Sequence, residues 1–265
     1  MIRIAPYLVA NTVFPMQPSP VEARTVVANG LSNREFLEQY ARAGRIGLSG
    51  GLTLIDKAIC RAERHLDEEA LWGLWSHVFL FQGQRLDGHH WVIESDLQIH
   101  RKHIQLGVQE NRISKYFDEH LYTSLAVLDL GLTEAQVACL LCEGLDLVAS
   151  RARYSLRELF GTLIALRRPE LRARSNVLAR ERSLYCSALL QHVFRKAGLD
   201  LAPGVDLKNT TPEDIARTPV PHITYLLRRD ATQSKLAKLN ARLRRKVGAR
   251  LRHLKRRRLS PSRSQ

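Results

Sequence analysis

A cysteine, a histidine and a glutamate in this chain have the residue types of a nucleophile, a base and a group that orients the base. Cys186 lies in a stretch that reads as a capped helix over 183–197. Ser183 is the expected N-cap, which places Cys186 at about the third helical position. Free backbone N–H groups and the helix dipole favour an anion there, so this thiol is a candidate thiolate.

The same spacing supports a structural interpretation of Cys186. Leu190, Val193 and Ala197 follow it at helical intervals and share its face. Free cysteines are among the most buried residue types, so a small apolar side chain on a buried helix face stays open as an alternative.

His77 and Glu94 lie in two expected strands, 76–83 and 89–96, joined by a turn around residues 84–87. Pairing these strands about that turn puts His77 directly opposite Glu94. Cross-strand Cβ atoms are about 4.5–5.5 Å apart, so the carboxylate could accept a hydrogen bond from the imidazole. An ion pair on a sheet surface is the alternative, and a register slip of one residue would separate the two side chains.

Hydrophobic periodicity predicts an α+β fold, because helices and strands do not alternate in βαβ units. Residues 1–31 are expected to form an irregular arm. A capping box, Ser32 with Glu35, begins a short helix that is expected to end at Gly44. The further expected elements are a helix within 51–66, strands at 76–83, 89–96, 103–110, 125–130 and 221–227, and helices at 133–149, 155–167 and 183–197.

The other thiols and the histidines suggest no metal or cofactor. Cys139 and Cys142 lie in an apolar helical run after the N-cap signal Thr133, so we interpret them as core residues. The histidine pairs 89–90 and 100/103 flank alternating segments, where neighbouring side chains point to opposite faces, and no further ligand completes a zinc set.

The chain carries no recognisable export or membrane signal. Pro6 and Pro15 interrupt the short apolar run near the N-terminus, and no 18 consecutive residues are apolar. We therefore expect reduced thiols in a cytoplasmic protein, with peripheral attachment at the inner face of the membrane as an option.

Most of the net charge of +15 lies at the C-terminus. From Arg228 onward there are fifteen Lys and Arg residues and one acid, Asp230, which leaves the preceding body almost neutral. Leucines recur at three- and four-residue intervals from Leu236 to Leu254, so the tail, 229–265, is expected to be a basic amphipathic helix. Its partner is either an anionic membrane or nucleic acid, or the leucines pack on the body or on a second copy.

Three motifs in order resemble those of the circularly permuted papain-like cysteine amidases, the YiiX/YebB-like relatives of the NlpC-type cell-wall hydrolases. They are Ser76-His77-Val78, Val92-Ile93-Glu94 and Tyr185-Cys186-Ser187. The stretch TTPEDIARTP, 210–219, resembles the segment before the final strand of that family. The resemblance covers residues 46–228.

The resemblance implies a permuted papain-like fold, with an antiparallel sheet against helices, and a cysteine hydrolase that needs no cofactor. Cys186 would attack an amide or ester carbonyl of a peptide, acyl-amide or lipid-amide substrate. His77 would move the proton, Glu94 would orient His77, and the Cys186 backbone N–H would form half of an oxyanion hole. Tyr154 and Tyr185 would contact substrate.

Gly51 and Asp56 stand where this family has a closely spaced Gly-Asp strand, so the sequence departs from the pattern there. The implied arrangement is an N-terminal arm with a short helix (1–45), a catalytic domain (46–228) and the basic tail (229–265). Amines in place of water would make the enzyme a transferase. The alternative function is an inactive papain-like binding protein whose tail binds anionic membrane or nucleic acid.

Overall fold

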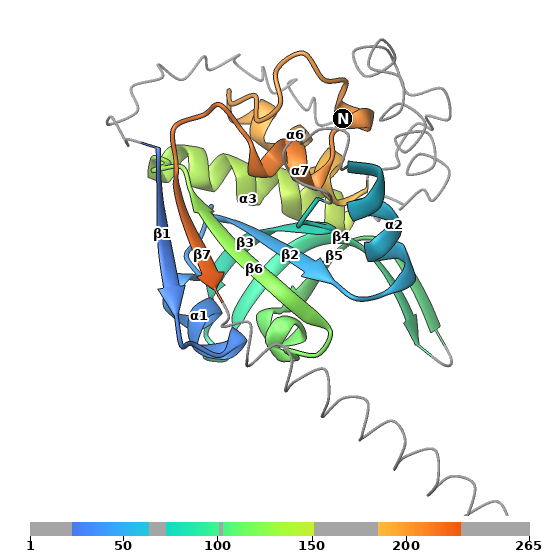
Figure 1. Ribbon diagram of the computed structural model, residues 1–265. Helices are drawn as coiled ribbons and strands as arrows, with labels where there is room; N and C mark the ends of the chain where they lie inside the picture. Colours follow the sequence, from blue (N-terminus) through green and yellow to red (C-terminus); the bar gives the residue numbers. More distant parts are fainter. Residues whose placement is uncertain (1–22, 64–72, 101–102, 151–184, 229–265) are drawn as a thin grey trace, which may run out of the picture.

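Seven strands form one mixed sheet in the described residues of the computed structural model, which are 23–63, 73–100, 103–150 and 185–228 (Figure 1). The strand order across the sheet is β1-β7-β6-β2-β3-β4-β5. The strands are β1 (Arg24–Asn29), β2 (Ile46–Gly51), β3 (His77–Gln84), β4 (His90–His100), β5 (His103–Arg112), β6 (Tyr122–Asp129) and β7 (Ile223–Arg228).

The helices lie on both faces of the sheet, so the α+β class expected from the sequence is confirmed (Figure 1). The sheet is mixed and not wholly antiparallel as expected, because β1 runs parallel to β7. The helical elements are α1 (Asn33–Tyr40), α2 (Leu54–Glu63), η2 (Ile113–Phe117), α3 (Glu134–Ala149), α6 (Cys186–Lys196), η3 (Leu207–Asn209) and α7 (Pro212–Ala216).

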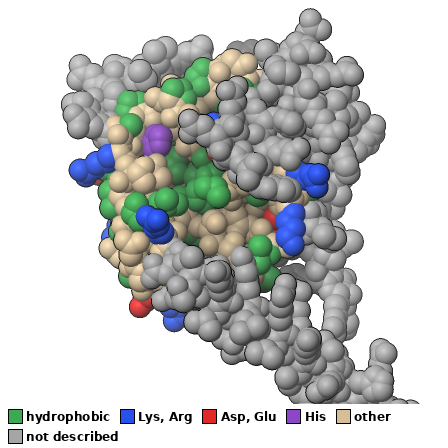
Figure 2. All heavy atoms as spheres, viewed as in Figure 1, with side chains coloured by type: hydrophobic (Ala, Val, Ile, Leu, Met, Phe, Trp, Pro, Cys, Tyr) green, Lys and Arg blue, Asp and Glu red, His purple; other side chains and the backbone are tan. Residues whose placement is uncertain are grey.

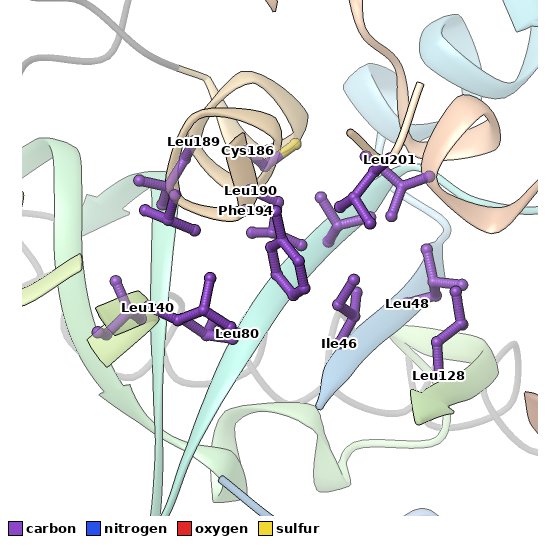
Figure 3. Close-up of a cluster of buried hydrophobic side chains, with 14 of the residues drawn as sticks. Ile46, Leu48, Leu80, Leu128, Leu140, Cys186, Leu189, Leu190, Phe194 and Leu201 are labelled. Carbon is purple, nitrogen blue, oxygen red and sulfur yellow. The ribbon is translucent and has the colours of Figure 1, made fainter. Parts of the chain in front are cut away.

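Strand alternation divides the buried side chains into two cores, one on each face. Val78 and Leu80 of β3 join the core beneath α3 and α6, where Leu190 and Phe194 also lie (Figure 3). Phe79, between them in sequence, joins the core on the other face with α1 and η2. Because successive strand residues point to opposite faces, one strand contributes to both cores.

Gly47 of β2 makes room for the second core. A Cβ atom there would lie 2.1 Å from the Phe79 ring, which crosses β2 at this position. Glycine therefore lets the aromatic side chain pack flat over the neighbouring strand.

Local end signals fixed several helix boundaries. The Ser32–Glu35 capping box is present at the start of α1, and the Thr133 N-cap is present at the start of α3. Helix α1 ends at Tyr40, earlier than the expected Gly44, and Gly44 instead takes a positive φ of 81° in the turn into β2.

Three expectations about the first fifty residues and α3 were wrong. Residues 24–29 are not irregular, because they pair with β7. The strand β2, at the centre of the sheet, was not expected. Cys142 is exposed, so its interpretation as a core residue was wrong, whereas Cys139 is partly buried and packs against the first core.

In the described part of the chain, no helix has the length and apolar character needed to cross a bilayer. Figure 2 shows that, on the face viewed in Figure 1, hydrophobic side chains of the described residues gather toward the middle and charged ones lie mostly toward the edges. The expected helix 155–167, the N-cap Ser183, Tyr154 and the basic tail lie outside the described residues. The three-part division of the chain stays a prediction.

Candidate active site

His77 is the first residue of β3, and both strand pairing and ring contacts hold it in place. Ser49 of β2 is its cross-strand partner. The imidazole shares a face with Phe79 and lies beside the stacked rings of Phe79 and Tyr116, with its centroid 6.3 Å from each. These ring contacts restrict the orientation of the imidazole.

The imidazole Nε2 atom of His77 lies 2.6 Å from Oε2 of Glu94. The two residues are not directly opposite, however, because Leu80 pairs with Ile93 and Phe81 with Val92. The expected register was wrong by two residues. A shift of two preserves the face of every side chain, so His77 and Glu94 meet diagonally across the hairpin.

Glu94 is fully buried and both of its carboxylate oxygens are occupied. Oε2 accepts from the Tyr116 hydroxyl as well as contacting His77. Oε1 accepts from Asn111 Nδ2 at 2.6 Å and from Lys115 Nζ at 2.8 Å. The carboxylate can therefore rotate only by breaking several hydrogen bonds at once.

Charges around Glu94 keep it ionised despite its burial. Burial alone would raise the pKa of the carboxyl, but the Lys115 ammonium and the hydrogen-bonded His77 outweigh it, so the pKa lies well below the usual value. A buried ionised carboxylate at Nε2 favours a proton on that nitrogen, which leaves Nδ1 of His77 to face other groups.

Cys186 is the first residue of α6, and Tyr185 is the N-cap. The expected cap, Ser183, was two residues too early, so the thiol lies at N1 rather than near N3. Figure 3 shows Cys186 at the end of the helix whose Leu190 and Phe194 enter the first core. Cys186 is 5% exposed, which agrees with the structural interpretation as well as with a shielded nucleophile.

Cys186 and His77 shift each other's protonation. Burial raises the pKa of the thiol, but the charge of His77 and a hydrogen bond from it lower the pKa below 9.0. Burial lowers the pKa of His77, but Cys186 and Glu94 raise it to about 10. The two directions agree, because both favour a proton on the imidazole and negative charge on the sulfur.

Backbone groups near Cys186 favour negative charge. The first N–H groups of an α-helix lack intrahelical acceptors, so those at the start of α6 are free to bind an anion. The N–H of Val78 and the hydroxyl of Ser187 also lower the pKa of the Cys186 thiol. The candidate oxyanion donor, the Cys186 backbone N–H, lies at this end of the helix.

The pKa values of two other thiols are shifted upward, in the opposite direction to that of Cys186. Burial, followed by the charges of Glu63 and Asp56, raises the pKa of Cys60 to about 12. Burial and the nearby Glu143 also raise the pKa of Cys139. Neither of these cysteines is a thiolate near neutral pH.

One group in the described residues has ligand atoms spaced closely enough for a metal ion, namely His77, Glu94 and Asp96, whose atoms lie within 4.8 Å of one another. The Lys115 ammonium already contacts both carboxylates, at 2.8 Å from Glu94 and 2.6 Å from Asp96. We therefore assign the positive charge of this cluster to the lysine. His89 and His90 belong to no such group in the part of the chain that is described.

A cavity of about 210 Å³ lies beside the strand that carries the partner of His77. It begins at Gly50 and Gly51, directly after Ser49, and Leu74 lines it just before β3. The Ser49 hydroxyl is buried and has no hydrogen-bond partner. The described residues that line it are Gly50, Gly51, Lys57, Cys60, Gly73, Leu74, Thr123 and Ser124.

Tyr185 is buried at 1% exposure, and its hydroxyl donates to the Thr210 carbonyl at 2.8 Å. This bond joins the start of α6 to the segment 210–219 and occupies the hydroxyl that was expected to contact substrate. The other expected tyrosine, Tyr154, lies outside the described residues.

Sequence reasoning missed the residues that surround Glu94. Asp96 was detectable, because it shares a strand face with Glu94 at a spacing of two. Lys115 and Tyr116 follow β5 on the single turn η2, and no local pattern connects them to β4. Only the approach of that turn to the sheet identifies them.

No protein-family model matches this chain, and no curated protein sequence matches it significantly. Among solved structures, the crystal structure of metalloprotein YiiX from Escherichia coli O157:H7 is similar at 12% identity and a TM-score of 0.46. The match covers 71% of this chain and 97% of that one.

Proposed function

We propose that the protein is a cysteine hydrolase that cleaves an amide or ester through an acyl-enzyme on Cys186. The observation that carries the proposal is a chain of side-chain contacts, in which the Cys186 thiol hydrogen-bonds to His77 and Nε2 of His77 lies 2.6 Å from Oε2 of the buried Glu94. A catalytic triad consists of a nucleophile, a base that hydrogen-bonds to it, and a third group that hydrogen-bonds to the base and orients it.

The proposed reaction begins with attack of the Cys186 sulfur on the substrate carbonyl carbon. The Cys186 backbone N–H donates to the oxyanion that forms. The C–N bond then breaks as protonated His77 gives its proton to the leaving amine, and a thioester remains. A water molecule next gives a proton to His77 and its oxygen to the acyl carbon, and the C–S bond breaks. The thiolate–imidazolium pair is thereby restored.

The burial of Cys186, at 5% exposure, favours a second candidate function. A protein that binds a partner without cleaving it has no need of an accessible thiol. The basic tail, 229–265, would bind an anionic membrane or nucleic acid in this candidate.

The two candidates are separated by a thiol-directed acylating probe at pH 7, followed by mass spectrometry. The hydrolase predicts that Cys186 is acylated faster than Cys60 or Cys139, because only its thiol has a lowered pKa. Exposed Cys142 is the internal reference for an accessible thiol. Equal slow acylation of Cys186 and Cys60 would exclude the hydrolase.

A further inference from the structure

The cluster on the far side of Glu94 from His77 contains a fixed cation. Lys115 Nζ lies 2.8 Å from Glu94 Oε1 and 2.6 Å from Asp96 Oδ2, so one ammonium is shared by two carboxylates. Its side chain is only 20% exposed. Burial lowers the pKa of this lysine, but Glu94 and Asp96 outweigh it and raise the pKa above its ordinary value, so the charge persists.

We infer that Lys115, held by Asp96, is a positioning residue that keeps Glu94 ionised and presents its Oε2 atom to His77. The inference rests on the proposed function, since it assigns Lys115 a role in setting the protonation of the Cys186–His77 pair. Lys115 touches neither the sulfur nor a reacting carbonyl.

The division of contacts on Glu94 supports this role. Oε1 is taken by Lys115 and Asn111, whereas Oε2 is taken by His77 and Tyr116. The ammonium thus anchors one oxygen and leaves the other to contact His77 and Tyr116. Without it, Glu94 and Asp96 would be neighbouring carboxylates, and like charges disfavour ionisation of a buried acid.

The titratable groups near Glu94 come from three elements besides its own strand. The four charged side chains among them and Glu94 sum to about zero when His77 is protonated, because Lys115 and His77 balance Glu94 and Asp96. The titratable groups facing Glu94 are His77 on β3, Asp96 on β4, Lys115 and Tyr116 on η2 and Tyr122 on β6.

The test is the pH dependence of the alkylation of Cys186 by iodoacetamide in the full-length protein. Removing a cation raises the pKa of every acid beside it, so in Lys115→Met the acid limb of the rate profile should move up by about one pH unit. Lys115→Arg keeps the charge and should restore most of the shift. Lys196→Met, at the exposed end of α6, should leave the profile unchanged.

Asp96→Asn should shift the acid limb of the alkylation profile in the opposite direction. It also keeps the inference testable if Lys115→Met does not fold. It removes a negative charge and leaves Lys115 wholly to Glu94, so the acid limb should move down. A folded Lys115→Met with the parent midpoint overturns the inference, as does an Asp96→Asn midpoint that stays or rises. A lysine that only supports the fold would change the melting temperature and leave both midpoints in place.

A failure of the proposed function is distinguishable from a failure of this inference. If Cys186 does not react at any pH, the hydrolase is excluded, but the His77 imidazole can still be titrated by NMR. Its midpoint should then fall in Lys115→Met, because a Glu94 that takes up a proton no longer stabilises the imidazolium, and in Asp96→Asn, because a nearby negative charge is lost. An imidazole that titrates alike in all three proteins contradicts the role of Lys115.

Discussion

Glu94 Oε2 lies 2.6 Å from His77 Nε2 although the two residues are not paired across the β3–β4 hairpin. The contact is diagonal, and it survives because both side chains point to the face that packs against η2. That face supplies Tyr116 and Lys115, which hold the carboxylate in place. Five predictions follow from these contacts and from the charge pattern of the chain.

His77→Ala should lower the rate of Cys186 alkylation at pH 7 by about tenfold or more, because the thiol loses the imidazolium that lowers its pKa. The measurement is the rate of iodoacetamide labelling by mass spectrometry. His192→Ala is the matched control, since His192 on α6 forms a similar contact with Glu143 at 2.8 Å. Equal rates in the two variants would mean that His77 does not activate the thiol.

Glu94→Gln should move the titration midpoint of His77 down from about 10 by one pH unit or more. The amide keeps a hydrogen-bond acceptor but loses the negative charge that stabilises the imidazolium. NMR of the labelled imidazole gives the midpoint directly. Glu143→Gln, which removes a charge beside His192 instead, should leave the His77 midpoint where it is.

Tyr116→Phe should reduce the free energy of unfolding by about 1–3 kcal/mol, because Glu94 Oε2 loses a charge-assisted hydrogen bond inside the protein. The phenylalanine ring still stacks on Phe79, whose centroid is 4.2 Å away. Urea denaturation at pH 7 measures the change. Tyr40→Phe keeps a comparable stack on Tyr225 and should have a much smaller effect.

Glu63→Gln should stabilise the protein at pH 8 and have little effect near pH 5. Burial, together with the nearby charges of Glu213 and Asp214, raises the pKa of Glu63 well above 4.5. The folded state therefore holds this proton more tightly than the unfolded chain. Stability is fully present below about pH 4.5 and is lost as the pH rises through the raised folded value.

The neutral amide removes that loss and can still accept the Glu213 backbone N–H at Oε1, as Glu63 does at 3.2 Å. Melting curves at the two pH values measure the difference, and about 1 kcal/mol corresponds to a few degrees in a chain of this size. Exposed Glu38→Gln on α1 is the control. A gain that is equal at both pH values would show that titration of Glu63 is not its cause.

Deleting residues 229–265 should abolish salt-sensitive binding to anionic vesicles or DNA and leave the Cys186 reaction intact. Nearly all of the net charge lies beyond Arg228, and the candidate catalytic residues precede it. Such affinity comes from clustered cations and released counterions, so it should weaken steeply between low and high salt. Circular dichroism of the truncated protein checks that it folds. Undiminished binding would place the anionic surface in the body.

Short-range patterns in the sequence determined several parts of this molecule. The Ser32–Glu35 capping box and the N-cap signal Thr133 predicted two helix starts, because a cap is a contact between residues three apart. Alternation along 76–83 and 89–96 put His77 and Glu94 on one face, because the side-chain period of a strand is fixed by the backbone. The same alternation could not give the register, which a bulge between Phe81 and Gly83 shifts.

The tertiary structure decided what lies around those residues. The parallel pairing of β1 with β7 joins distant segments, and no periodicity within either strand specifies a partner. The thiol of Cys186 acquires its lowered pKa from His77, which reaches it only when α6 packs on the sheet. Lys115 and Tyr116 look like ordinary residues of a short turn until that turn closes over Glu94. Sequence thus supplied the chemical groups and their faces, while long-range packing supplied the distances and charges that make them a site.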